Sequence, residues 1–296
     1  MGLGALLLAS GGGTTPVRAL ASDPVVAAAG DIACDPQSPS FNGGMGTTSN
    51  CRQKAVSDLM LDPAAFPGLA AVLPLGDNQY EDGAYSRYLA SYDPSWGRLN
   101  ALAHPVPGNH EYGTAGAAGY FRYFGAAAGN AQADTAWNAG AWHMIGLNGE
   151  CGDVGGCGAT SPQGQFLRSH LGSKQCTLAY WHEPYDNGNN LIADYRSFWQ
   201  TLSAAGADVV LNGHIHTYAR FAPQDPDGQV DAAHGIRQFI VGTGGKSQGS
   251  IPGTHNVEFT QSGFGILELR LHDASYDWKY VAVDGSVIDS GSAPCH

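Results

Sequence analysis

Two histidines separated by one residue follow a short apolar run in the last third of the chain. The run Val209-Val210-Leu211 stops at Asn212-Gly213, and His214 and His216 come next. An apolar run that ends at Asn-Gly is typical of a buried strand followed by a tight turn. Neutral histidine is the commonest metal ligand among side chains. On a loop, two histidines at this spacing can face two metal ions lying side by side; the alternative is a pair of solvent-exposed loop histidines.

Apolar runs elsewhere in the chain also lead into polar residues that could bind a metal ion. Together with the first pair, the residues so placed are Asp31, Asp77 with Tyr80, Asn109 with His110, His182, and His214 with His216. Singly, each has an ordinary explanation, since aspartates form turns and helix caps and a buried histidine usually has a hydrogen-bond partner. Five strand ends or following loops that together supply oxygen and nitrogen atoms favour a metal centre. The mixed set of donors suits two ions of Zn, Mn or Fe better than Ca or Mg.

The spacing of apolar residues predicts alternating strands and helices. Strands are expected over 24–29, 69–75, 142–147, 176–181, 209–211 and 237–241, with a closing antiparallel pair over 264–271 and 277–283. Helices are expected over 53–61, 85–92, 161–171 and 193–205. In the third helix, Ser161 would be the N-cap and Pro162 the first helical residue. This order would gather the polar residues at the carboxyl ends of strands, where open α/β sheets bind ligands.

The composition indicates one folded domain and argues against a nucleic-acid partner. The chain has 296 residues, 43% of them hydrophobic, which is enough for one large core. Its formal net charge of −12 would repel a polyphosphate backbone. Residues 1–21 resemble a secretory signal peptide with a cleavage site at Ala19-Leu20-Ala21, although the usual positive charges at its start are missing. No other stretch is long and apolar enough to span a membrane, and residues 24–296 are expected to form a single domain.

The six cysteines include no CxxC pair, which argues against a zinc knuckle. An even number of cysteines behind a secretory leader indicates disulfides in an extracellular protein, and the alternative is a set of buried free thiols. Six cysteines allow about fifteen pairings. Proximity in the sequence favours Cys34–Cys51 and Cys151–Cys157, which leaves Cys176 to pair with Cys295.

Taken in order, the polar motifs resemble the signature of the calcineurin-like metallophosphoesterases. The motifs are Gly30-Asp31, Gly76-Asp77-x-x-Tyr80, Gly108-Asn109-His110-Glu111, His182, and Gly213-His214-x-His216. They look most similar to the purple acid phosphatase branch, because Tyr80 is present and Ala33 stands where the general family has a histidine. The resemblance covers about residues 24–290 and is to the short, single-domain forms of that branch.

This resemblance implies a fold and a metal centre. The implied fold is of the α/β (α+β) class, a four-layer sandwich of two mixed β-sheets flanked by helices. One metal ion, expected to be Fe(III), would be bound by Asp31, Asp77, Tyr80 and His216. The second ion, Zn, Fe or Mn, would be bound by Asp77, Asn109, His182 and His214. Asp77 would therefore bridge the two ions, and His110 would be a catalytic group beside the substrate phosphate.

The implied activity is that of a secreted phosphatase acting on a small phosphorylated substrate. It would hydrolyse phosphomonoesters with a hydroxide held by the two ions, and His110 would give a proton to the leaving oxygen. The alternatives are a phosphodiesterase or nucleotide hydrolase of the same superfamily, and a non-catalytic binding protein on this fold. The sequence differs from this branch in two places, one expected to contact the substrate phosphate and one in the last motif. Residues 183–190 contain no further histidine after His182, and Ala219 replaces the glutamate usual in the tail of the last motif.

Overall fold

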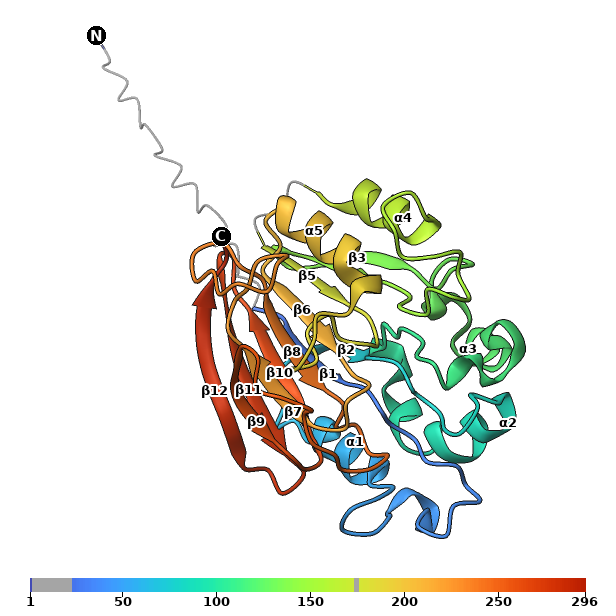
Figure 1. The fold of residues 1–296 in the computed structure, drawn as a ribbon. Helices are drawn as coiled ribbons and strands as arrows, with labels where there is room; N and C mark the ends of the chain where they lie inside the picture. Colours follow the sequence, from blue (N-terminus) through green and yellow to red (C-terminus); the bar gives the residue numbers. More distant parts are fainter. Residues whose placement is uncertain (2–22, 173–175) are drawn as a thin grey trace.

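The computed structural model describes residue 1 and residues 23–172 and 176–296, and it places two β-sheets at the centre of the molecule (Figure 1). Apart from Met1, the predicted leader at 1–21 lies outside the described residues. Among the described residues, one sheet has five strands in the order β12-β11-β10-β1-β2. Its strands are β1 (Val25–Ala29), β2 (Leu69–Pro74), β10 (Gly265–Leu271), β11 (Ser275–Ala282) and β12 (Val287–Pro294).

The second sheet has seven strands in the order β3-β4-β5-β6-β8-β7-β9, again among the described residues. Its strands are β3 (Thr135–Ala139), β4 (Trp142–Gly146), β5 (Cys176–Tyr180), β6 (Val209–Asn212), β7 (Tyr218–Phe221), β8 (Arg237–Val241) and β9 (Val257–Gln261). Both sheets are mixed. Strands β1 and β2 are parallel, whereas β10 to β12 run antiparallel, and β4, β5, β6 and β8 are parallel with antiparallel neighbours at both ends.

Along the central strands of the second sheet, successive side chains belong to two different hydrophobic clusters. In β5, Leu178 and Tyr180 belong to the larger cluster, which also contains the buried residues of β1, β2 and β10. The intervening Ala179 belongs to a second cluster, together with Phe198 and Trp199 of the helix α5 (Arg196–Ala204). Because side chains alternate between the faces of a strand, one face of this sheet packs toward the first sheet and the other toward helices.

Helices cover the sheets on their outer sides. They are α1 (Gln53–Leu61), α2 (Tyr85–Arg87), α3 (Ala118–Phe124), α4 (Pro162–His170) and α5. Figure 1 shows α4 and α5 together beside the seven-stranded sheet, with α1, α2 and α3 toward the other end of the molecule. Short 3₁₀ segments lie at Asn42–Gly44, Trp96–Leu102, Glu111–Gly113, Ala115–Ala117, Gly125–Ala128 and Ala193–Tyr195.

The structure confirms the predicted class of two mixed sheets with helices and most of the predicted elements. Helix α1 has the predicted bounds, and the Ser161 side chain caps α4 by accepting a hydrogen bond from the Gly164 N–H at 3.1 Å. The predicted helix over 85–92 instead continues from α2 as a π-helical turn over Tyr88–Tyr92. Strands β3, β7, β9 and β12 were not predicted. Strands β3, β9 and β12 are sheet edges with largely solvated side chains and so lack an apolar run, and β7 (Tyr218–Phe221) has only four residues, one of them charged.

Three disulfides join the six cysteines, in the predicted pairing. They are Cys34–Cys51, Cys151–Cys157 and Cys176–Cys295. The alternative of buried free thiols is therefore wrong. Disulfides persist in oxidising environments, so this set indicates an oxidising compartment. Among the described residues, none of the helices has the length and apolar character needed to cross a membrane.

Candidate metal centre

The carboxyl ends of four strands from both sheets meet at one place. Asp31 follows β1, Asp77 follows β2, His182 follows β5, and His214 with His216 follows β6. Backbone hydrogen bonds tie these ends together. The Asp31 N–H donates to the Gly76 carbonyl at 3.0 Å, and the Gly213 N–H donates to the His182 carbonyl at 2.8 Å. The topology therefore brings together residues that lie up to 185 positions apart in the sequence, as between Asp31 and His216.

Three of these residues have a left-handed backbone, with φ of 59° at Asp31, 48° at Asp77 and 68° at His214. Such a conformation is unfavourable for any residue other than glycine, and aspartate and asparagine tolerate it best. Strained backbone tends to gather at functional sites, where the surrounding structure holds it in place. Here the strain turns each side chain off the end of its strand toward the others.

Two glycines allow the chain to approach these side chains closely. A Cβ atom at Gly76, whose φ is +86°, would lie 2.5 Å from Nδ1 of His182. A Cβ atom at Gly108 would lie 2.4 Å from Oδ1 of Asp77. Only glycine fits at these two positions, which explains why both belong to the motifs that surround the candidate ligands.

One cluster of four side chains forms around the Tyr80 hydroxyl. This oxygen lies 2.9 Å from Oδ1 of Asp31 and 2.9 Å from Oδ2 of Asp77. It is 3.2 Å from Nε2 of His216, which in turn lies 3.0 Å from Oδ1 of Asp31. Three oxygen atoms and one nitrogen atom therefore converge within the spacing that ligands of a single ion have. The structure brings together all four residues predicted for the first metal ion.

A second cluster shares Asp77 with the first. One ligand atom from each of Asp77, His182 and His214 lies within 4.8 Å of the other two. Nδ1 of His182 lies 2.8 Å from the Leu75 carbonyl, to which it donates, so that Nε2 faces Oδ2 of Asp77 at 3.3 Å. This Nε2 is buried, and its ion-pair partner is the Asp77 carboxylate. Buried charged groups are paired or bind metal ions, and a cation between this nitrogen and this oxygen would stabilise both.

The loop between the 3₁₀ segments at Trp96–Leu102 and Glu111–Gly113 carries the two remaining predicted residues. The backbone N–H of His110 donates to Oδ1 of Asp77 at 2.9 Å, and Nε2 of its ring lies 3.8 Å from Oδ2. His110 therefore faces the shared carboxylate. Asn109 is exposed, and its side chain makes no hydrogen bond within the described part of the chain. The structure thus places Asn109 beside His110 on one loop, with no hydrogen bond among the described residues between its side chain and the other candidate ligands.

Several supporting residues were not predicted from the sequence. The buried carboxylate of Glu111 accepts hydrogen bonds from the N–H groups of Gly108 at 2.8 Å and Gln79 at 3.1 Å, which holds the loop against β2. Ser247 lies on the loop after β8, with its hydroxyl 2.6 Å from Nδ1 of His216. Glu111 could have been inferred from its place in the motif with Asn109. Ser247 belongs to no motif and carried no signal.

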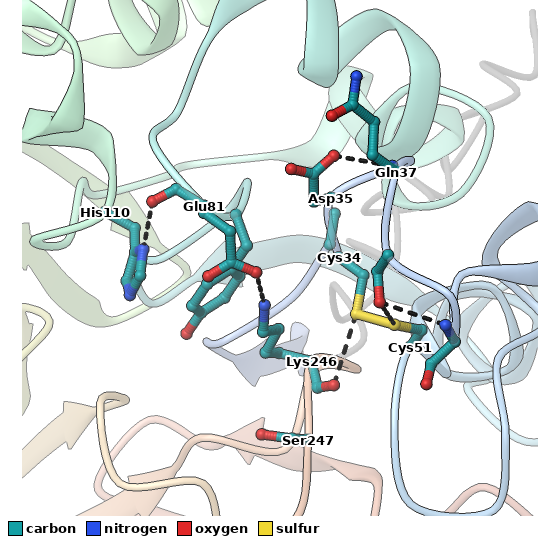
Figure 2. Close-up of polar contacts among 12 residues, drawn as sticks. Cys34, Asp35, Gln37, Cys51, Glu81, His110, Lys246 and Ser247 are labelled. Atoms are coloured by element: carbon teal, nitrogen blue, oxygen red, sulfur yellow. Dashed lines mark hydrogen bonds and ion pairs between the residues drawn. A yellow bond between two sulfur atoms is a disulfide. The ribbon is translucent and has the colours of Figure 1, made fainter.

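A charged pair covers the outer side of Tyr80. Figure 2 shows the Lys246 ammonium group joined to the Glu81 carboxylate, with Nδ1 of His110 directed at the Glu81 carbonyl, 2.5 Å away. Nζ of Lys246 lies 4.2 Å from the centre of the Tyr80 ring, in a cation–π arrangement. The His110 ring packs against the same ring, with 4.2 Å between centroids. These contacts fix the phenol in position between the two aspartates.

The protonation of the two clusters is dominated by Asp77. Although burial alone would raise its pKa, the nearby charges of His182 and His110 hold the pKa of Asp77 below its usual range. Burial alone would lower the pKa of His182, but the Asp77 carboxylate raises it well above its ordinary value. Burial, together with the charges of Asp31 and Asp77, raises the pKa of the Tyr80 phenol well above 10. Two carboxylates and a phenol buried together favour a bound positive charge at this site.

The donor set fits two metal ions. The first cluster offers carboxylate and phenol oxygens with one imidazole, and the second offers two imidazoles with the shared carboxylate. Imidazole with oxygen donors suits Zn, Fe and related ions, whereas Ca²⁺ and Mg²⁺ prefer oxygen alone. The buried Nε2 of His182, which faces the Asp77 carboxylate, and the glycines packed against these two side chains are consistent with a site for cations.

Comparison with known proteins agrees with this geometry. A family model described as calcineurin-like phosphoesterase matches residues 26–218. Among solved structures, a purple acid phosphatase from seeds of yellow lupin (Lupinus luteus) is similar with a TM-score of 0.71 and 16% identity. The similarity covers 94% of this chain and 55% of the lupin enzyme, so the chain spans little more than half of that relative.

Two smaller structures share the fold at 12% identity. A dimetal phosphatase from Danio rerio has a TM-score of 0.58, with 93% of this chain and 100% of that chain covered. The anchor protein of the Plasmodium inner membrane complex has a TM-score of 0.61, with 93% and 90% covered. At these identities the structures show the fold alone. No curated protein sequence matches the chain significantly. Since the family model matches about two thirds of the chain, across the strand ends described above, the chain belongs to the calcineurin-like phosphoesterase family, whose members are generally metal-dependent hydrolases.

Proposed function

We propose that the chain is a phosphomonoesterase that works with two metal ions. The observation that carries this proposal is the position of a single oxygen atom. Oδ2 of Asp77 lies 2.9 Å from the Tyr80 hydroxyl in one cluster and 3.3 Å from Nε2 of His182 in the other. An oxygen that faces both clusters is suited to bridge two ions. Two ions at about 3.5–4 Å from each other are the usual device for in-line displacement at phosphorus.

We assign each ion to a set of residues. The first ion would be held by Asp31, Asp77, Tyr80 and His216, and the second by Asp77, Asn109, His182 and His214. Fe(III) is proposed for the first set, because the raised pKa of Tyr80 means that only a strongly acidic cation would displace the phenol proton. Zn, Fe or Mn is proposed for the second.

When bound, such a pair of ions supplies Lewis-acid stabilisation of the phosphoryl group and a nucleophile derived from water. The residues of the chain supply positioning and a proton. The N–H of His214 donates to Oδ2 of Asp31 at 2.8 Å, and the N–H of His110 donates to Oδ1 of Asp77. Both carboxylates are therefore fixed before any substrate arrives. Nδ1 of His110 is occupied by the Glu81 carbonyl, so its Nε2 is the atom that would give a proton to the leaving oxygen.

We further propose that the protein is secreted, with residues 1–21 as its leader and residues 24–296 as its phosphoesterase domain. The three disulfides support this, since they indicate an oxidising compartment. The acidic net charge supports a small phosphorylated substrate over nucleic acid.

The test uses protein purified without chelator. Metal analysis should find two ions per chain, and initial rates should be higher with p-nitrophenyl phosphate than with bis(p-nitrophenyl) phosphate. A higher rate with the diester would favour the phosphodiesterase alternative. Two tightly bound ions with no turnover of either ester would favour the non-catalytic one.

Asp77→Asn sharpens the test, because asparagine keeps the shape and the backbone preference of the residue and removes only its charge. This variant should lose at least one ion and nearly all activity while keeping its fold. Asp82→Asn is the matched control, since Asp82 lies five residues away and forms an ion pair with Arg87 outside both clusters. An Asp77→Asn variant with two ions and normal turnover would refute the bridging assignment.

A further inference from the structure

A small cavity opens beside His214, a candidate ligand of the second ion. Its volume is about 200 Å³, and its walls include Glu183, Asn187, Ile192, Ile215 and Pro252 together with His214. Pockets for drug-sized ligands usually measure 300–1,000 Å³. A cavity of this size therefore suits a group of a few heavy atoms, and its contact with a candidate ligand of the second ion places such a group next to the reacting phosphate.

Glu183 supplies the charge of this cavity. Its Oε1 lies 3.9 Å from Nε2 of His214, at the metal end. Its Oε2 accepts a hydrogen bond from the buried Tyr195 hydroxyl at 2.8 Å, which fixes the carboxylate. No lysine or arginine is among the described residues that line the cavity. The closest arginine along the following helix, Arg196, is paired with Asp227. The carboxylate is thus held in place by a neutral partner, at one end of a cavity whose described lining has no basic side chain other than His214.

The rest of the wall limits what can bind. Ile192, Ile215 and Pro252 are apolar, and His214 contributes the only ring that could stack on a base among the described lining residues. Flat nucleic-acid bases are usually held by stacking on aromatic side chains. The wall therefore suits a compact group with an apolar surface and a positive charge better than a nucleoside. A quaternary or primary ammonium on a short carbon chain has both properties.

We propose that this cavity receives the alcohol part of the ester, and that Glu183 makes the protein selective for phosphomonoesters of small amino alcohols. The inference rests on the proposed phosphomonoesterase activity and deepens it. With the phosphate held at the metal centre, the ammonium group would enter the cavity and lie against the Glu183 carboxylate. Alcohols that carry a second negative charge would be repelled by the same carboxylate.

The experiment compares two substrates of equal shape. Phosphocholine carries a quaternary ammonium, and 3,3-dimethylbutyl phosphate has carbon in place of that nitrogen. We expect kcat/KM of the metal-loaded protein to be about tenfold higher for phosphocholine, because its ammonium group would form a partly exposed ion pair with the Glu183 carboxylate. Glu183→Gln should bring the ratio close to one. Asp194→Asn is the matched control, because Asp194 is exposed near Tyr195 without lining the cavity, and it should keep the wild-type ratio.

Three results would overturn the inference, and they separate it from the proposed function. Equal kcat/KM for the two esters, in a protein that hydrolyses p-nitrophenyl phosphate, would refute the proposed selectivity and leave the proposed phosphatase activity standing. Loss of a metal ion in Glu183→Gln would mean that Glu183 positions His214 instead. If no ester is hydrolysed, calorimetry decides, using two phosphonates that cannot be cleaved, 3-(trimethylammonio)propylphosphonate and 4,4-dimethylpentylphosphonate. Tighter binding of the charged phosphonate would support the cavity assignment although the proposed phosphatase activity was refuted. Equal binding of the two phosphonates would refute both proposals.

Discussion

Replacement of His110 by alanine separates metal binding from proton transfer. The residue supports Asp77 through its backbone N–H, at 2.9 Å from Oδ1, and alanine keeps that group. The side chain contacts the Glu81 carbonyl and the face of Tyr80 and is partly exposed. In His110→Ala, Tyr80 keeps its hydrogen bonds to Asp31 and Asp77 and its contact with Lys246, and Asp77 keeps the hydrogen bond from the backbone at 110. The variant should therefore bind its two ions as the wild type does.

The expected loss of rate depends on the leaving group. General acid catalysis contributes roughly 10²–10⁴-fold, which corresponds to about 3–5 kcal/mol of transition-state stabilisation. An alkoxide needs a proton in order to leave, so kcat for an alkyl phosphate should fall by about this factor. p-Nitrophenolate is a stable anion and needs little help, so kcat for p-nitrophenyl phosphate should fall by less than about tenfold.

The assay measures kcat for both esters and the metal content of the same samples. His234→Ala is the control, because the His234 side chain is 79% exposed and makes no contact with the two clusters. Loss of a metal ion from His110→Ala would show that the side chain belongs to the ligand set. An equal fall in kcat for both esters would show that His110 stabilises the phosphoryl group instead of protonating the leaving oxygen.

Other residues give three further predictions. Tyr80→Phe should abolish the visible charge-transfer absorption expected of a tyrosinate bound to Fe(III); a colourless wild type that is fully active with zinc alone would contradict the iron assignment. Alkylation of the unreduced protein should modify no cysteine, and loss of Cys176–Cys295, which closes a loop of 119 residues, should lower the free energy of unfolding by about 5 kcal/mol, measured by urea denaturation. Burial raises the pKa of Asp134 from 3.8 to about 6, so folding favours its protonated form. This contribution to the free energy of unfolding is complete below pH 4, and about 3 kcal/mol of it is lost as the pH rises through 6. Relative to the wild type, Asp134→Asn should therefore gain about that amount between pH 4 and pH 7.5 in urea unfolding, and a difference that does not change with pH would contradict the buried assignment.

The sequence was sufficient where a residue's environment follows from its neighbours in the chain. Helix α1 shows a 3.6-residue apolar period, and Ser161 with Pro162 marks the start of α4, so both were predicted correctly. The ends of β1, β2 and β6 could be predicted because each joins an apolar run to a Gly-Asp or Asn-Gly turn. Asp31, Asp77, Tyr80 and His216 meet in the structure for this reason.

Contacts between distant segments could not be predicted in this way. Lys246 reaches Tyr80, and Ser247 reaches His216, from a loop whose sequence has no motif. Glu183 stands next to a candidate ligand, yet its role depends on Tyr195 and on the shape of a cavity. In each case the two partners lie on segments that follow the ends of strands, and their positions relative to each other depend on the fold and leave no periodic pattern in the sequence.

The left-handed backbone at Asp31 and Asp77 has a consequence for how such a site changes over generations. At these positions the backbone itself favours aspartate, asparagine or glycine. In a lineage that stopped binding metal, folding stability alone would still favour these three residue types at both positions. Aspartate there is thus retained for two independent reasons, and its presence in a related sequence is weak evidence of catalysis. Tyr80 and His216 have no such backbone constraint, since neither has a positive φ. They would be free to drift first, which makes them the better markers of a working centre among descendants of this fold.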